Sequence, residues 1–243
     1  RSFGYFFSVI REYKNSIYYK FDKNYQPDVV LTSGNISKED LKLNSPHKNI
    51  KILGCNKDTS KNVQFNILKN KDKKITTVLV CPEGLFSETK QMLKLINNDL
   101  LNHDNIKFIF RTHPLIDVFR DFRENKVNKN IIFSKDKDIK KDFKKSDVIL
   151  YSGSSVCVQA VMNGLVPINF NNEENNFSLD PLYKINKFII KDSKMLEATI
   201  ISINENRFRK RFKKNIYTIK KYCNLYFKEF NQGALIKSII TKK

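Results

Sequence analysis

With 243 residues, the chain is long enough to bury one large hydrophobic core or two smaller ones. Its 40% hydrophobic and 12% aromatic residues are typical of a globular protein, and no apolar run reaches the roughly 18 residues of a membrane span. Lysine and arginine outnumber aspartate and glutamate by 45 to 25. The net charge of +20 is compatible with phosphate-bearing substrates, anionic membrane surfaces or nucleic acid as partners, but a lysine-rich composition accounts for most of the excess.

Apolar runs of strand length alternate with helical patterns along the chain. In the first part, strands are predicted over 27–34 and 49–54, with a short helix between them. We expect residues 1–55 to be the end of an N-terminal α/β domain that is truncated in this sequence, which begins with Arg1 instead of Met. The stretch 56–75 is rich in lysine and asparagine and has little periodicity, so it is predicted to be a linker.

The second part alternates more regularly, and we predict one domain over 76–205. Its strands are expected at 76–81, 106–111, 130–134, 147–152, 165–170 and 187–190. Helices are expected at 87–101 with Ser87 as N-cap, at 138–146, and at 154–163 before Gly164. Apolar strands separated by helices predict an α/β fold with a doubly wound parallel sheet that is covered on both faces. Residues 206–243 are predicted to form C-terminal helices.

Three loops that follow predicted strands carry polar residues suited to holding a ligand. In a doubly wound sheet these loops share one rim, and ligands bind at that rim. Glycine allows close backbone approach, while hydroxyls, an imidazole, a guanidinium and the N–H groups at a helix start attract phosphate. Taken alone, the Ser-Gly-Ser-Ser turn fits a capped turn without a ligand equally well, but the three loops together favour a phosphate or diphosphate cradle. The candidate residues are Glu83, Gly84, Arg111, His113, Pro114, Ser152, Gly153, Ser154 and Ser155.

Several other kinds of site lack support in the sequence. Walker-type and G-x-G-x-x-G phosphate loops are absent, as is the G-x-S-x-G elbow of hydrolases. The four cysteines are far apart and the three histidines are scattered, so we predict neither a disulfide framework, a metal site nor a cofactor. These features favour a reduced, cytoplasmic protein.

The segments VLVCPEG, FIFRTHP and SDVILYSGSSVCVQAVMNGLVPINF, followed by LDPL, resemble the C-terminal, nucleotide-binding half of GT-B-fold glycosyltransferases. The similarity covers roughly residues 76–190 and rests on the order and spacing of short motifs. It is closest to bacterial capsule and surface-polysaccharide enzymes of the sialyltransferase-like and polysialyltransferase-like kind. The CDP-glycerol glycerophosphotransferases and the UDP-N-acetylglucosamine 2-epimerases are more distant.

This resemblance implies roles for individual residues. The His113-Pro114 and Ser154-Ser155 pairs match motifs that bind the donor nucleotide in those families, and His113 would stabilise the leaving phosphate or donate a proton to it. Gln159 stands near the position at which many GT-B enzymes hold the ribose with a glutamate, and this departure leaves the type of nucleotide open. The family's general base belongs to the N-terminal, acceptor-side domain, so none is assigned here. The last helix would cross back to that domain.

The sequence thus predicts metal-independent transfer of a sugar from a nucleotide-sugar donor to a surface or capsular glycan acceptor. A sugar-nucleotide epimerase or a polyol-phosphate transferase with the same cradle is the first alternative. A basic nucleic-acid-binding protein is the second, but no recognition motif for nucleic acid is present and the charge is scattered. The amphipathic, basic stretch 207–221 is open to two interpretations, a contact with an anionic membrane at its inner face or a helix packed by its apolar stripe.

Overall fold

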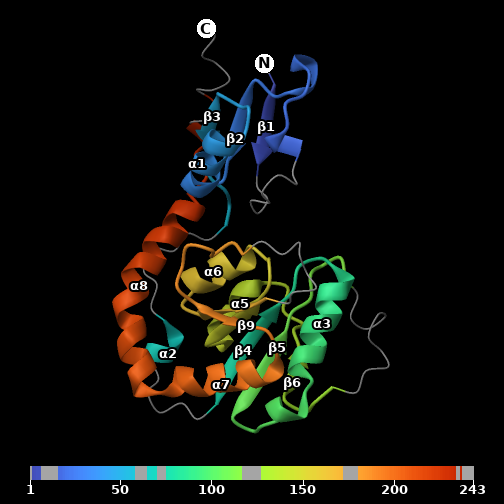
Figure 1. Cartoon of the computed structure of the whole chain (residues 1–243), viewed down its shortest axis with the longest axis vertical. Coiled ribbons are helices and arrows are strands. Elements are labelled where there is room, and N and C mark those ends of the chain that lie inside the picture. Colours follow the sequence, from blue (N-terminus) through green and yellow to red (C-terminus); the bar gives the residue numbers. More distant parts are fainter. Residues whose placement is uncertain are drawn as a thin grey trace. The chain divides into compact units, whose positions relative to one another are not determined.

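The computed structural model describes residues 2–6, 16–57, 65–69, 75–116, 127–171, 180–233 and 236. The chain divides into two compact units (Figure 1). Unit 1 consists of residues 1–59 and 220–243, and unit 2 of residues 60–219. Unit 1 therefore contains both ends of the chain, and unit 2 is inserted between its two segments.

Unit 2 is built on a six-stranded parallel sheet. Its strand order is β6-β5-β4-β7-β8-β9. The chain thus adds β5 and β6 on one side of β4 and then β7, β8 and β9 on the other side. Side chains of β4, β7 and β8 are buried along their whole length, because helices cover both faces of a parallel sheet. The strands are β4 (Thr76–Cys81), β5 (Ile106–Phe110), β6 (Ile131–Phe133), β7 (Val148–Tyr151), β8 (Val166–Phe170) and β9 (Phe188–Ile190).

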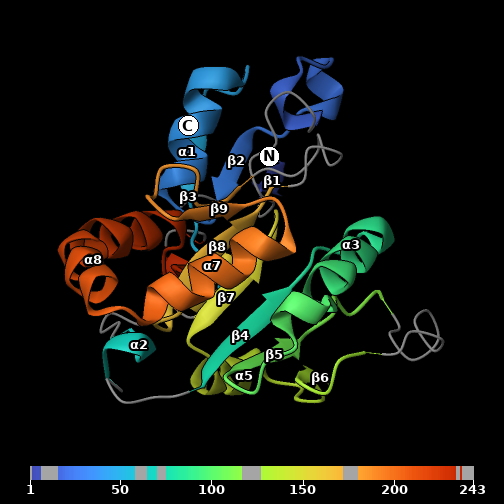
Figure 2. The same cartoon turned by 60° about the horizontal axis from the view of Figure 1, so that its bottom comes forward.

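Helices connect these strands, and Figure 2 shows α3 and α7 on one face of the sheet with α5 behind it. The helices and helical turns of unit 2 are α2 (Asn66–Lys69), α3 (Phe86–Ile96), η3 (Asp99–Leu101), α5 (Ile139–Lys145), α6 (Val156–Met162) and α7 (Ser193–Asn204). Gly164 follows α6 with a φ of 91°, which is the left-handed conformation expected of a glycine after a helix. The predicted doubly wound α/β sheet is thus confirmed.

The start of α3 differs from the prediction. Leu85 occupies the N-cap position and makes no side-chain cap, so the prediction of Ser87 as N-cap is wrong. The carboxylate of Glu88, in the first turn, instead accepts a hydrogen bond from the backbone N–H of Glu83 at 3.0 Å. A glutamate at this position reaches back toward the preceding loop as in a capping box, and it therefore fixes the loop between β4 and α3.

Unit 1 contains a smaller parallel sheet of order β1-β2-β3, with strands β1 (Phe3–Phe6), β2 (Val29–Thr32) and β3 (Ile50–Ile52). Helix α1 (Asn35–Asn44) follows β2, and two short 3-10 turns, η1 (Ser16–Tyr18) and η2 (Lys23–Tyr25), precede it. The predicted strands at 27–34 and 49–54 are present, whereas β1 was not predicted. Its aromatic residues lack a clear alternation, and the strand is defined by its pairing with β2.

The C-terminal segment of unit 1 packs closely on two glycines. A Cβ atom on Gly34 would lie 2.1 Å from the carbonyl oxygen of Tyr226, and one on Gly54 would lie 2.1 Å from that of Glu229. Gly54 also has a φ of 84°. Both positions therefore require glycine, because any side chain would displace the backbone that lies on them.

Helix α8 (Asn206–Tyr226) contributes residues to both units. Its apolar stripe is buried at Phe212, Ile219 and Tyr222, so this face packs on the protein. Arg209 is also buried, whereas Arg207, Lys210 and Arg211 are exposed. Part of the predicted linker 56–75, namely 58–64 and 70–74, lies outside the described residues. The units divide at 59/60 and 219/220, compared with the predicted boundaries at 55 and 205.

Candidate functional site

The three predicted ligand loops follow three neighbouring strands. Strand β4 pairs with β5 on one side and with β7 on the other, and all three run parallel. Cys81, the last residue of β4, lies opposite Tyr151, the last residue of β7, while Val80 lies opposite Phe110 at the end of β5. The loops therefore start at the same edge, with adjacent strands about 4.8 Å apart. The strand order reverses between β4 and β7, which is where ligands bind in such sheets.

The structure brings the loops after β4 and β5 into contact. A Cβ atom on Gly84 would lie 3.1 Å from Nδ1 and 3.3 Å from Cγ of the His113 ring. Glycine thus allows the imidazole to lie directly against the backbone of the neighbouring loop. The carboxylate of Glu88 holds the same loop in place through the N–H of Glu83, one residue before Gly84.

A backbone hydrogen bond sets the direction of the imidazole of His113. The N–H of Leu115 donates to Nδ1 of His113 at 3.3 Å. Because Nδ1 accepts this hydrogen bond, the proton of the neutral ring is on Nε2. Nε2–H is then the donor that His113 can offer to a ligand.

The turn between β7 and α6 uses most of its own backbone donors. The N–H of Val156 donates to Oγ of Ser154 at 3.4 Å, and the N–H of Cys157 donates to the carbonyl of Ser154 at 3.1 Å. The N–H of Val158 donates to the carbonyl of Ser155 at 3.2 Å. These N–H groups thus have partners within the turn, and their contribution to phosphate binding stays a prediction. Ser154 accepts through Oγ and keeps its hydroxyl hydrogen for another acceptor.

The remaining predicted residues differ in burial. Ser152 and Gly153 are buried beneath the rim, and the carbonyl of Ser152 accepts a hydrogen bond from the Asn169 side chain at 2.8 Å. Ser155 and Gln159 are half-buried, and Pro114 is exposed. Ser152 and Gly153 thus shape the turn, while Ser154, Ser155 and Gln159 remain partly accessible.

Arg111 is bound within the protein by an ion pair and by backbone carbonyls. Its Nη1 lies 2.6 Å from Oδ2 of the buried Asp142, and its guanidinium also donates to the carbonyls of Asp136 at 2.8 Å and Lys137 at 3.1 Å. The hydroxyl of Ser134 donates to the same Asp142 oxygen at 2.7 Å. Arg111 therefore has a structural role in which its charge is neutralised within the protein, and its contact with phosphate stays a prediction.

A second network at this edge was not predicted. The hydroxyl of Tyr151, at the end of β7, donates to Asp180 Oδ1 at 2.7 Å, and the other carboxylate oxygen of Asp180 forms an ion pair with the buried Lys187. The ammonium group of Lys187 also donates to the carbonyls of Leu182 and Ile185. This network fixes the chain after the LDPL segment against β7. Asp180 belongs to the LDPL segment, and this motif was the feature of the sequence that could have indicated the network.

Other features limit the chemistry of the site. Burial raises the pKa of the Cys81 thiol to about 12, so this side chain under the loops is a neutral packing group. All four cysteines are free thiols. Within the described ranges, no three His, Cys, Asp or Glu side chains come together as a metal ion would require. In the same part of the chain, no helix has the length and apolar character needed to cross a bilayer.

Comparison with known proteins gives structural likeness only: neither a known protein family nor a curated protein matches the sequence. A glycotransferase of kitacinnamycin matches with a TM-score of 0.55 at 8% identity, over 88% of this chain and 55% of that one. HepE from Anabaena, in complex with UDP and glucose, matches with a TM-score of 0.53 at 14% identity, over 90% and 64%.

The wall teichoic acid polymerase TagF also matches, with a TM-score of 0.52 at 13% identity, over 96% of this chain and 64% of that one. The chain thus spans between half and two thirds of the length of these structures. At such low identity the likeness shows the fold alone. The chain has a GT-B-like α/β fold.

Proposed function

We propose that this chain binds a nucleotide-activated sugar at the edge formed by the ends of β4, β5 and β7, and that it transfers the sugar to a surface or capsular glycan without a metal. The observation that carries the proposal is the contact of His113 with Gly84 at the point where the strand order reverses. A binding site is typical of this point in a parallel sheet. The GT-B-like fold, shared with a structure that holds UDP and glucose, supports a sugar nucleotide as the ligand.

The proposed chemistry is stabilisation of the leaving group. When the bond between the sugar and the nucleotide phosphate breaks, negative charge develops on the phosphate. The Nε2–H of His113 and the hydroxyl of Ser154 are oriented to donate hydrogen bonds to it, because each side chain already accepts one from the backbone N–H two residues later. Fixed donors aimed at developing charge give a large part of enzymatic rate enhancement. In this proposal Gln159 contacts the ribose, and the general base and the acceptor are not assigned.

The test compares two histidines of the same unit. We expect His113→Ala to lower the transfer rate by about 10²–10³, the range for loss of one fixed donor to a developing anion. His103→Ala is the matched control, because His103 precedes β5 at the other edge of the sheet and pairs with Glu197 at 3.0 Å. Wild-type turnover in the His113 variant, or an equal loss in both variants, would contradict the proposal.

Transfer of a polyol phosphate is the second candidate, and the likeness to the wall teichoic acid polymerase favours it. The two functions share the phosphate site but differ in the group that moves. A thermal-shift screen with UDP, CDP, GDP and CMP ranks the nucleotides, since a ligand that binds only the folded protein raises its stability. Product analysis with sugar-linked and polyol-linked donors then separates sugar transfer, polyol-phosphate transfer and epimerisation.

A further inference from the structure

A pocket of about 460 Å³ lies in unit 2 away from the proposed donor site. Val166 and Phe188, which begin β8 and β9, line it, whereas the donor site lies beyond the last residues of β4, β5 and β7. The pocket thus lies on the side of the sheet where β8 and β9 are, and none of its lining residues is one of the predicted donor-site residues. The volume is in the range of pockets that hold small organic ligands.

One wall of the pocket is apolar and aromatic. The Phe188 and Phe208 rings lie 5.3 Å apart between centroids, and the Phe208 and Phe212 rings stack at 5.2 Å. Pro167 and Val166 extend this wall. Such a surface favours a ligand with a flat or apolar organic part.

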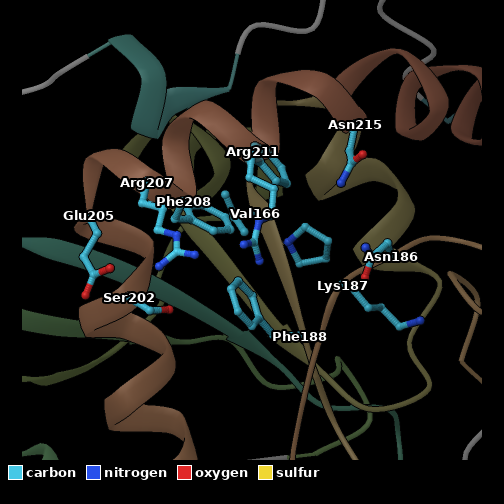
Figure 3. A pocket seen from close by; sticks show the side chains of 12 residues that line it. Val166, Asn186, Lys187, Phe188, Ser202, Glu205, Arg207, Phe208, Arg211 and Asn215 are labelled. Carbon is cyan, nitrogen blue, oxygen red and sulfur yellow. The ribbon is translucent and has the colours of Figure 1, made fainter.

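Two arginines provide the charge. Arg207 and Arg211 are four residues apart on α8 and thus on the same face of the helix. Figure 3 shows both guanidinium groups pointing into the pocket, on the side where the Phe188 ring lies. Neither arginine forms an ion pair with any residue that the structure describes. Two like charges at this spacing repel each other, and an anion between them would offset the repulsion.

The other charged residues of the lining do not cancel these arginines. Lys187 is already neutralised by Asp180, and its ammonium donates to two carbonyls. Glu205 is the single acidic residue of the lining, and it pairs with neither arginine. Asn186, Ser202 and Asn215 add neutral hydrogen-bonding groups. The pocket therefore combines two unpaired guanidinium groups, an aromatic wall and a few polar side chains.

We propose that this pocket binds an organic phosphate: the arginines take the phosphate group, and the organic part lies against Phe188 and Phe208. Guanidinium groups bind phosphate oxygens through pairs of parallel hydrogen bonds, which lysines, far more abundant in this chain, do not provide. The pocket is separate from the donor site and makes no use of His113. It would be an effector or anchoring site, occupied independently of transfer.

The test measures binding of phenyl phosphate to the whole chain by calorimetry. Phenol and inorganic phosphate, which each carry only one half of this ligand, are measured for comparison. We expect phenyl phosphate to bind more tightly than either, and the double variant Arg207→Gln/Arg211→Gln to weaken it about tenfold or more. The matched control is the double variant Lys213→Gln/Lys214→Gln, which removes the same amount of positive charge. Both lysines are exposed residues of the same helix and lie outside the pocket. This control should change the affinity less than twofold.

The outcomes separate a defined site from diffuse attraction. An equal loss in the arginine and lysine variants, or no loss in the arginine variant, would overturn the proposal. Because all four substituted side chains are exposed, we expect every variant to fold, which the unfolding curve checks. His113→Ala should leave this binding unchanged, so a failure of the proposed transferase function is distinguished from a failure here.

A second arm identifies the source of the phosphate. Co-sedimentation with vesicles of phosphatidylcholine and phosphatidylglycerol is compared between the arginine and lysine double variants. A selective loss of vesicle binding in the arginine variant assigns the pocket to a lipid headgroup. Equal vesicle binding in both variants, with selective loss of phenyl phosphate, assigns it to a free organic phosphate. If the arginine variant binds both phenyl phosphate and vesicles as well as the lysine variant does, the proposed site is contradicted.

Discussion

Two parts of unit 2 differ in how positive charge is paired. Where β4, β5 and β7 end, Arg111 is bound by the buried Asp142 and by backbone carbonyls. In the pocket lined by the first residues of β8 and β9, Arg207 and Arg211 have no ion-pair partner among the described residues. The proposed donor site thus relies on neutral donors held by the backbone, and the second pocket relies on charge.

This contrast shows that net charge does not locate a site in this chain. Most of the excess of 20 positive charges is spread over the surface, as a lysine-rich composition produces. Unpaired arginines beside aromatic rings are more informative than many lysines, because a guanidinium gives directional hydrogen bonds. Neutral donors with fixed directions are likewise suited to charge that appears only during a reaction.

The largest expected effect is on stability, and it compares Arg111 with an arginine of the second pocket. Arg111→Gln leaves Asp142 buried without its partner, and we expect a loss of about 3 kcal/mol in the free energy of unfolding, the lower end of the range for breaking a buried ion pair, because Arg111 remains partly exposed. Arg211→Gln should change it by less than about 0.5 kcal/mol. Urea unfolding measures both changes, and similar losses would remove the distinction between a paired and an unpaired arginine.

The contact between Gly84 and His113 offers the next test. In Gly84→Ala the new Cβ would lie 3.1 Å from Nδ1, so the imidazole must shift. We expect the transfer rate to fall about tenfold with little loss of stability, since small displacements of a catalytic group are costly. Gly233→Ala, whose Cβ would make an ordinary 3.4 Å contact, is the control. An unchanged rate in Gly84→Ala would show that the position of His113 is not critical.

A smaller effect is expected at Ser154. Ser154→Ala removes the proposed hydroxyl donor and the acceptor for the N–H of Val156. One neutral hydrogen bond is worth about 0.5–1.5 kcal/mol, so transfer should slow by up to about tenfold. Steady-state kinetics should show rescue by Ser154→Thr, which keeps the hydroxyl. If the alanine and threonine variants lose the same activity, the hydroxyl is not the relevant group.

The smallest effect concerns the thiols. It tests whether the loops of the proposed donor site keep reagents away from the buried Cys81. Burial raises the pKa of Cys81 to about 12, so at neutral pH this thiol remains protonated and unreactive, and it would ionise only as the pH approaches that value. Labelling of the native protein should modify the half-buried Cys55 first and leave Cys81 unmodified until unfolding. Fast labelling of Cys81 would indicate that the loops open.

The fold was largely predictable because its signals are local. Eight apolar runs became strands, and the glycine after α6 ended that helix as predicted. β1 was missed because its aromatic residues lack a clear alternation, so that only its pairing with β2 defines it. The start of α3 was missed because a buried glutamate fixed the loop in place of a serine cap.

The site was predictable only in part. The order of motifs correctly indicated which loops lie at one edge, but the role of Arg111 depends on Asp142, 31 residues later, which no local pattern connects to it. The second pocket is likewise assembled from the starts of two strands and from helix α8. No motif marks it, although the alternation of arginine with phenylalanine over 207–212 was visible in the sequence.

The packing of the segment after α8 on the sheet of unit 1 has a consequence for folding during translation. Residues 226–231 lie on Gly34 and Gly54 and exchange backbone hydrogen bonds with Ser33, Leu53 and Cys55. A ribosome delivers these residues only after all of residues 60–219. Domains generally fold as units as they emerge during translation. The inserted unit therefore completes its fold first, and the sheet of unit 1 obtains these packing partners only after the inserted unit has been made.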